Sequence, residues 1–227
     1  MSVRVRTGLT AWVWVGLLAT ASAASPPIYG GDDGFTPLFD GKGLEGWRVI
    51  GGKPEAWAVE KGGLLVSLGE GGGWLGSSRS YSDFDLKLEF RVSSGSNSGV
   101  YLRAPGDASH ISRTGMEIQI LDETHERHKS IKDWQRTGSI YHVAAPKPGH
   151  NKPVGEWNTM EIVAKGSHVV ITLNGATVVD DRLDAHPELA AEHTGLKRTE
   201  GLIGLQSHNG RVEFRNIRVI DLKKGSA

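Results

Sequence analysis

The sequence predicts an all-β protein, a two-sheet antiparallel β-sandwich with one short helix. Short apolar runs are interrupted by turn residues throughout the chain, and glycine is abundant at 31 of 227 residues. No long segment has the apolar period of an amphipathic helix. Many short strands separated by frequent turn signals are typical of a sandwich.

The clearest strand is residues 84–92, where five apolar residues alternate with charged ones. Alternation with a period of two predicts one buried face and one solvated face. A three-stranded meander is predicted next, because Gly166 and Asn174-Gly175 supply turn residues and Asn-Gly suits a type I′ turn. Its strands are residues 157–164, 168–174 and 176–180.

Two further elements are predicted near the C-terminus. A last hairpin would pair residues 202–207 with 212–222 through Asn209-Gly210. Residues 184–193 are predicted to form the short helix, with an aspartate as N-cap and Pro187 in the first turn. Residues 34–222 thus make one domain.

Residues 1–23 have the pattern of a signal peptide. Arg4 and Arg6 precede an apolar stretch, residues 9–21, and Ala21-Ser22-Ala23 is a small-x-small cleavage pattern. The stretch is shorter than the ~20 residues that span a bilayer, so no stable membrane anchor is expected. The chain has no cysteine, hence no lipid-bearing cysteine and no disulfide. We expect an exported protein, periplasmic or secreted.

The charge composition limits the classes of binding partner. The 26 basic and 26 acidic residues balance, which argues against nucleic acid or an anionic membrane held by bulk charge. Motifs of serine hydrolases, phosphate loops and zinc helices are absent from the sequence. No cofactor is required by the sequence, and it does not specify an oligomeric state.

The most informative segment is the strand-like run 115–122. Glu117 and Gln119 would share one face, with isoleucines on the other. Asp122 is out of phase and would join them only through a β-bulge, a feature common beside active sites. A polar row of this kind on a sheet predicts a sugar-binding face.

Other strands offer polar residues that could extend that face. Tyr101 and Arg103 would share one strand face. The tyrosine ring could stack on a sugar ring, and the arginine guanidinium could donate several hydrogen bonds to sugar oxygens. Residues 138–143 offer Ser139 and Tyr141, and the strand ending at Ser207 offers Gly204, Gln206 and His208. Gly204 would let a ligand approach the backbone. For the strand with Tyr101 and Arg103 alone, a merely polar surface explains the pattern as well. For His208 alone, a solvent-exposed or turn-capping histidine explains it better.

The segment 123–136 follows Asp122 directly and would form a loop beside the site. Trp134 within it, like Trp74, could be a sugar platform, whereas Trp47, Trp57 and Trp157 lie in apolar patterns typical of core. The spacing of His125 and His128 is not a common metal motif. A divalent ion held by Glu117, Asp122 and His125 is an alternative that the sequence leaves open.

These segments together resemble the 3-keto-disaccharide hydrolase domain family. The resemblance rests on motifs along nearly the whole mature chain: residues 34–47, 97–103, 117–122, 138–141, 155–158, 201–206 and 214–217. It implies a concanavalin A-like jelly roll with a concave sugar-binding face. It also implies activity on sugars whose C3 hydroxyl has been oxidised to a ketone.

A weaker similarity links Glu117-x-Gln119-x-x-Asp122 to the E-x-D-x-x-E strand of laminarinase-like glycosidases. Retaining hydrolysis needs two carboxyl groups ~5 Å apart. At ~3.3 Å per residue, the Cα atoms of Glu117 and Asp122 would lie more than ~10 Å apart. Ordinary double displacement is therefore disfavoured.

A 3-keto sugar needs less, because its ketone acidifies the proton at C2. One base, a donor for the enolate oxygen and an acid for the leaving oxygen suffice. We assign Glu117 or Asp122 as the base and Tyr141 or His208 as the acid. Arg103 and Gln119 are expected to bind the enolate oxygen or the sugar hydroxyl groups. Further substrate contacts are expected from Tyr101, Ser139, Gln206 and Trp134. The alternatives are a non-catalytic lectin-like module and a structural sandwich with a polar face.

Overall fold

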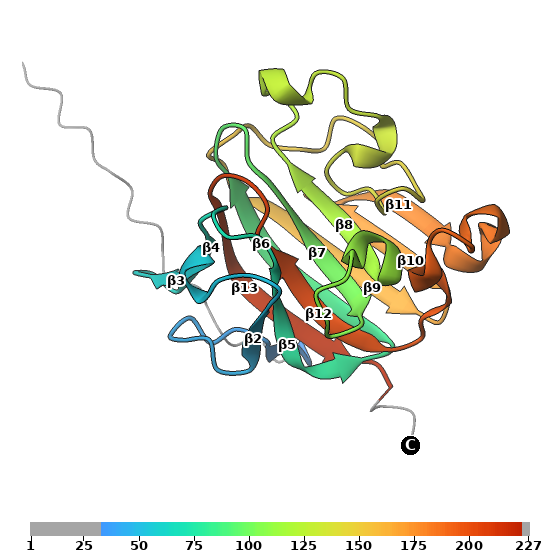
Figure 1. The fold of residues 1–227 in the computed structure, drawn as a ribbon, viewed down its shortest axis with the longest axis horizontal. Coiled ribbons are helices and arrows are strands. Elements are labelled where there is room, and N and C mark those ends of the chain that lie inside the picture. The colour runs from blue at the N-terminus through green and yellow to red at the C-terminus, as the bar shows by residue number, and fades with distance from the viewer. Residues whose placement is uncertain (1–32, 224–227) are drawn as a thin grey trace, which may run out of the picture.

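A computed structural model describes residues 33–223, which form two antiparallel β-sheets packed face to face (Figure 1). The predicted signal peptide lies outside the described residues. Within the described part of the chain, no helix is long and apolar enough to cross a membrane. The predicted all-β sandwich is confirmed.

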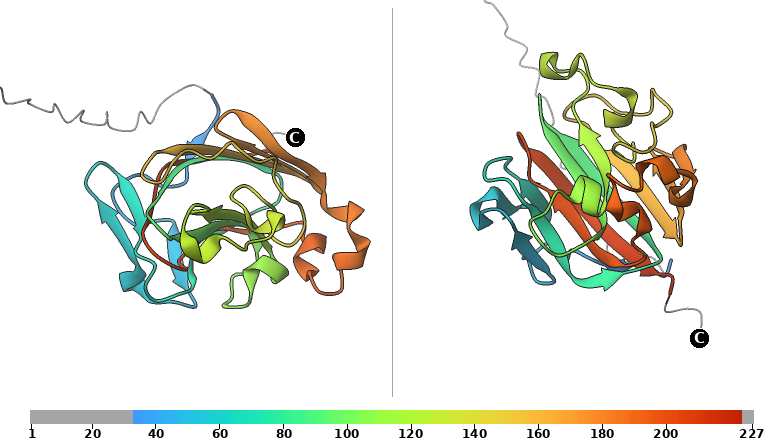
Figure 2. Two further views of the ribbon diagram at one scale, coloured as in Figure 1. Left: turned by 90° about the horizontal axis from the view of Figure 1, so that it is seen from above. Right: turned by 45° about the vertical axis from the view of Figure 1, so that its right-hand side comes forward.

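The larger sheet has the strand order β11-β10-β9-β6-β13-β4-β3, with β1 paired to β13. Seen from above, it arches over the smaller sheet (Figure 2). Its strands are β1 (Thr36–Pro37), β3 (Trp57–Glu60), β4 (Leu64–Ser67), β6 (Phe84–Val92), β9 (Asn158–Lys165), β10 (His168–Leu173), β11 (Ala176–Arg182) and β13 (Val212–Asp221).

The smaller sheet has the order β2-β5-β12-β7-β8. Its strands are β2 (Trp47–Ile50), β5 (Trp74–Tyr81), β7 (Asn97–Ala104), β8 (Met116–Leu121) and β12 (Gly201–Gln206). One face of this sheet packs on the larger sheet, and the other faces outward among loops (Figure 2). The outward face carries the polar residues discussed below.

The core lies between the sheets and is built by the expected alternation. Phe84, Leu86, Leu88, Phe90 and Val92 are all buried, while the residues between them are half-exposed. From the smaller sheet, the apolar partners include Val100, Ile118, Ile120, Ile203 and Leu205. Because these residues fill the interior, the polar residues that alternate with them must face outward.

The predicted meander is confirmed as β9, β10 and β11. Its second turn has positive φ at both central residues, 51° at Asn174 and 84° at Gly175, as a type I′ turn requires. Trp47 and Trp57 are core, as expected. Trp157 is not: it is half-buried between the guanidinium groups of Arg91 and Arg215, 4.8 and 4.0 Å from its ring centroid.

The last predicted hairpin is wrong. β12 and β13 belong to different sheets, so the connection through Asn209-Gly210 crosses from one layer to the other. Only Gly210 has positive φ there, and Asn209 forms an isolated bridge with Asn97. β12 pairs with β5 and β7, whereas β13 pairs with β4 and β6, so their apolar sides meet the same core from opposite sheets.

The short helix was predicted in the wrong place. Residues 184–193 form short 3-10 turns instead, because Pro187 disfavours helical geometry at the preceding residue and His186 has ψ 57°. The α-helix among the described residues is α1 (Ile111–Thr114), beside the smaller sheet. The 3-10 turns are η1 (Pro54–Ala56), η2 (Glu126–His128), η3 (Asp133–Gln135), η4 (Leu183–Ala185), η5 (Pro187–Leu189) and η6 (Thr194–Lys197).

Candidate active site

A cleft of about 500 Å³ lies on the outward face of the smaller sheet. Its floor comes from four adjacent strands, β5, β12, β7 and β8, and its walls come from loops at residues 51, 72–73 and 108–112 and from Tyr141. Among the described residues that line it, Glu117 is the one carboxyl group, and none is a lysine or arginine. The cleft is therefore suited to a neutral, hydrogen-bonding ligand.

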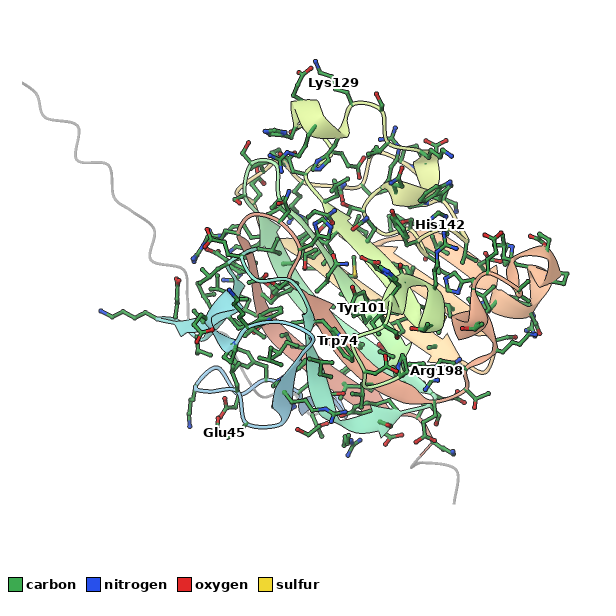
Figure 3. The ribbon with its side chains drawn as sticks, viewed as in Figure 1. Glu45, Trp74, Tyr101, Lys129, His142 and Arg198 are labelled. Atoms are coloured by element: carbon green, nitrogen blue, oxygen red, sulfur yellow. The ribbon has the colours of Figure 1, made fainter. Side chains whose placement is uncertain are left out.

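Trp74 lies across the floor next to Tyr101 (Figure 3). The two rings meet edge to face with centroids 5.6 Å apart. Trp74 has this position because two neighbours lack side chains: a Cβ on Gly204 would lie 2.5 Å from its ring, and one on Gly76 would lie 2.7 Å from it. The expectation that Gly204 opens room for a ligand is thus wrong, since the indole fills that room.

Glu117 is buried in the floor, with 4% of its surface exposed. Burial raises the pKa of its carboxyl group to about 8, although a hydrogen bond with Gln206 lowers it. The carboxyl group lies against Gly99, whose Cα has no side chain to displace it. A carboxyl group that titrates near neutral pH can both accept and return a proton.

Tyr101 lies directly opposite Glu117 in the β7–β8 pair. Its hydroxyl oxygen accepts a hydrogen bond of 2.7 Å from Nε2 of Gln206. Burial, followed by the nearby Glu117 charge, raises the pKa of Tyr101 well above its usual value. Tyr101 therefore stays protonated and can donate a hydrogen bond within the cleft.

Four other predicted residues also line the cleft: Gln119, Tyr141, Gln206 and His208. Gln119 shares a strand face with Glu117, as the alternation predicted. The Tyr141 hydroxyl accepts a 3.3 Å hydrogen bond from Gln135. His208 is exposed at the rim, where partial burial and then the charge of His128 lower its pKa.

Arg103 is not in the cleft, and the prediction that it faces the same way as Tyr101 is wrong. A register shift between β7 and β12 places an extra residue here, and Arg103 takes a φ of 49°. Its side chain is 1% exposed and donates hydrogen bonds to the backbone carbonyls of Ser82, Gly166 and Arg198. Arg103 fastens loops at one end of the sandwich.

Asp122 is also outside the cleft. The strand ends at Leu121, and no bulge turns Asp122 toward Glu117. Its carboxylate instead accepts hydrogen bonds from the backbone of Gly95 (2.7 Å) and from the backbone and hydroxyl of Thr124 (2.9 and 2.6 Å). Burial raises its pKa, but these hydrogen bonds outweigh burial and leave it below the usual value. Asp122 anchors two loops.

Ser139 and Trp134 do not line the cleft either. Residues 138–143 form a tight turn rather than a strand, so alternation does not hold there. The Ser139 hydroxyl is buried with no hydrogen-bond partner. Trp134 stacks on His142, with ring centroids 3.9 Å apart.

Several residues that line the cleft were not predicted. Asn97 and Ser207 stand at strand ends, where the alternation used for prediction stops, and residues 108–112 reach the cleft as a loop and the start of α1. His110 is the titratable residue of that wall. The sequence signal for this wall is an aromatic or polar loop that follows β7. Such loops are common, so the signal does not identify a binding site.

The metal alternative lacks its ligand set. Glu117 and Asp122 lie in different environments, and no group of three or more histidine or carboxylate residues suited to a metal ion occurs in the described residues.

A β-sandwich with a neutral, aromatic-floored cleft and one buried carboxyl group is the arrangement of a carbohydrate-active protein. The comparisons agree with this. The profile of the family described as the 3-keto-alpha-glucoside-1,2-lyase-like domain matches residues 34–220, and the chain belongs to that family.

Two kinds of relatives resemble the chain closely. The 3-keto-disaccharide hydrolase of Bacteroides thetaiotaomicron is 32% identical over 228 residues, covering 82% of this chain and 78% of the relative. A presumed glycosyl hydrolase from Parabacteroides distasonis, solved at 2.00 Å, is 30% identical with a TM-score of 0.72, covering 83% and 99% of the two chains. A carbohydrate-acting hydrolase is thus the class that these relatives support.

One more distant structure shows the fold alone. The exoplasmic domain of VIP36, in a form bound to Ca²⁺ and mannose, has a TM-score of 0.51 at 11% identity, covering 78% of this chain and 83% of that one.

Proposed function

We propose that the protein cleaves glycosidic bonds of 3-keto-glycosides, including 3-keto-disaccharides, by elimination. The observation that carries the proposal is Glu117, the single carboxyl group among the described cleft-lining residues, with a pKa raised to about 8. Retaining hydrolysis would need a second carboxyl group ~5 Å away. Elimination from a 3-keto sugar needs only one base. The activities for which the family and the Bacteroides relative are named support the substrate class.

In the proposed reaction, ionised Glu117 removes the proton from C2 and the electron pair moves onto the C3 oxygen as an enolate. Hydrogen-bond donors stabilise that oxygen. Gln119 and Tyr101 are the donors on the same floor, and they replace Arg103 in this role. The enolate then re-forms the ketone, expels the C1 oxygen and leaves a C1–C2 double bond.

The leaving oxygen needs a proton. For an α-glucoside it departs from the ring face opposite the C2 proton, so a group on a cleft wall must supply it. Tyr141 and His208 remain the candidates, and His110 joins them as a third residue of the wall. Addition of water to the double bond completes net hydrolysis. The N-terminal pattern supports action outside the cytoplasm, after export.

The deciding assay offers the purified protein a methyl 3-keto-α-glucoside beside its unoxidised parent, in D₂O. We expect turnover of the keto sugar only, with deuterium entering at C2. Glu117→Gln should lower turnover by at least ~10³-fold, whereas Glu156→Gln, at an exposed position, should not change it.

Each other outcome counts against the proposal. Cleavage of the parent sugar would indicate an ordinary glycosidase. Binding without turnover of either sugar would indicate a lectin-like module. Cleavage of the keto sugar with no deuterium entering at C2, and with no slowing when the substrate carries deuterium at C2, would exclude the proton abstraction.

A further inference from the structure

Three residues that line the cleft each have a buried polar atom with no hydrogen-bond partner in the protein. The atoms are Oδ1 of Asn97, Oε1 of Gln206 and Oγ of Ser207. A buried polar atom without a partner costs ~1–3 kcal/mol, so such atoms are rare unless they serve a purpose. Three such atoms on residues of the same cleft call for a shared explanation.

The backbone holds these residues in place. Asn97 and Asn209 exchange two backbone hydrogen bonds of 2.7 and 3.1 Å. The Ser207 amide donates to the Gly73 carbonyl at 3.0 Å. For Gln206, Nε2 donates to the Tyr101 hydroxyl at 2.7 Å, which turns Oε1 to the opposite side. The backbones of Asn97 and Ser207 and the side-chain amide of Gln206 are therefore preorganised.

The chemistry of these atoms defines what they can bind. The two amide oxygens only accept hydrogen bonds, and the serine hydroxyl both donates and accepts. A carboxylate, a phosphate or a ketone offers no donor to an amide oxygen. Sugar hydroxyl groups do, and the absence of lysine and arginine from the described cleft lining also fits a neutral ligand.

We propose that Asn97, Gln206 and Ser207 form a subsite that recognises unoxidised hydroxyl groups of the sugar ring. Its orienting consequence rests on the proposed function: because a ketone cannot donate, the oxidised C3 must lie away from the two amide oxygens of this subsite, toward Gln119. The subsite thereby sets which way round the ring enters the cleft.

A serine substitution gives an unusual signature. Ser207→Ala removes a hydroxyl group that the empty protein leaves unpaired, so thermal stability should be unchanged or raised. Affinity for methyl α-D-glucopyranoside should fall at least ~10-fold, because the ligand loses a partner. The matched control is Ser139→Ala, whose hydroxyl is equally buried and unpartnered but outside the cleft. It should leave affinity unchanged.

The ligand side completes the test. Titrations by NMR would compare the glucoside with its 2-deoxy, 4-deoxy and 6-deoxy analogues. In the wild type, at least one analogue should bind ~10-fold or more weakly, and Ser207→Ala should bind that analogue and the parent alike. Equal binding of all four sugars to the wild type, or unchanged affinity in Ser207→Ala, would overturn the subsite.

The subsite and the proposed function fail separately. If the glucoside binds through Ser207 but no keto sugar is turned over, the subsite stands and the enzyme does not. If neither the glucoside nor its 3-keto derivative binds the wild type, the subsite is refuted.

Discussion

Glu117 and Tyr101 face each other as directly opposed residues of β8 and β7, both buried and both with raised pKa values. Desolvation is the largest cause for each, and the ionised form of Glu117 further disfavours ionisation of Tyr101. The pair thus has one group that titrates near neutral pH beside one that keeps its proton. Two consequences of the buried position of Glu117 can be measured.

The first concerns stability against pH. The pKa of Glu117 rises from 4.5 in its ordinary state to about 8 in the folded protein. Folding therefore favours the protonated form, and this stabilisation is present below pH ~4.5 and lost as pH rises through 8. Thermal unfolding should show the wild type losing stability across that range. Glu117→Gln should flatten this part of the curve, and an unchanged slope would contradict the assigned pKa.

The second concerns space around the carboxyl group. A Cβ at Gly99 would lie 2.5 Å from Oε1 and 2.9 Å from Cγ of Glu117. Because Glu117 is buried and the added methyl group would push its carboxyl group out of position, Gly99→Ala should lower both the melting temperature and turnover of the keto sugar. The control is Gly43→Ala, where a Cβ would meet the carboxylate of Glu45, an exposed side chain that can move. Equal effects of both substitutions would refute the argument.

Arg103 provides a test of the corrected site. Arg103→Met would leave three backbone carbonyls without their donor, at ~1–3 kcal/mol for each one that stays buried. Urea unfolding should show a large loss of stability, while sugar affinity measured at low temperature on the folded protein should persist. Arg79→Met, which removes an arginine that is 49% exposed, should cost far less. Lost affinity at unchanged stability would return Arg103 to the binding site.

A carboxyl group on the larger sheet predicts a stabilising substitution. Burial, followed by repulsion from Glu161, raises the pKa of Asp85 from 3.8 to about 6. Its favourable protonated state is therefore lost as pH rises from ~4 through 6, which lowers stability above that range. Asp85→Asn should raise the melting temperature above pH 6.

Asp40 is the contrasting control for Asp85. Backbone hydrogen bonds from Lys42 and then Gly43 lower the pKa of Asp40. Asp40→Asn should therefore bring no gain above pH 6. A gain of equal size in both variants would point to net charge rather than to the environment of Asp85.

The sequence was informative wherever one strand face packs on the core. The alternation in Phe84–Val92 predicted β6 to the residue, and the same rule placed Glu117 and Gln119 together on the outward face of β8. The Asn174-Gly175 turn was predictable because its two residues tolerate positive φ without help from tertiary contacts.

The wrong predictions of site residues share a physical cause. The alternation of side chains along a strand stops being predictive beyond a bulge or the end of the strand. The extra residue at Arg103 reverses the direction of its side chain, and the end of β8 at Leu121 releases Asp122 from the sheet. Asn97 and Ser207 reach the cleft from strand ends. His110 reaches it through a loop whose path depends on the folded whole.

The indole of Trp74 occupies the space that side chains at Gly76 and Gly204 would otherwise fill. The large side chain at position 74 and the two glycines therefore depend on one another, and a change at any of the three alters the floor of the cleft. A smaller residue at position 74 would leave an indole-shaped vacancy between neighbouring strands. Such a vacancy offers a place for a synthetic aromatic compound to restore the floor, and so a chemical means of switching the cleft on and off.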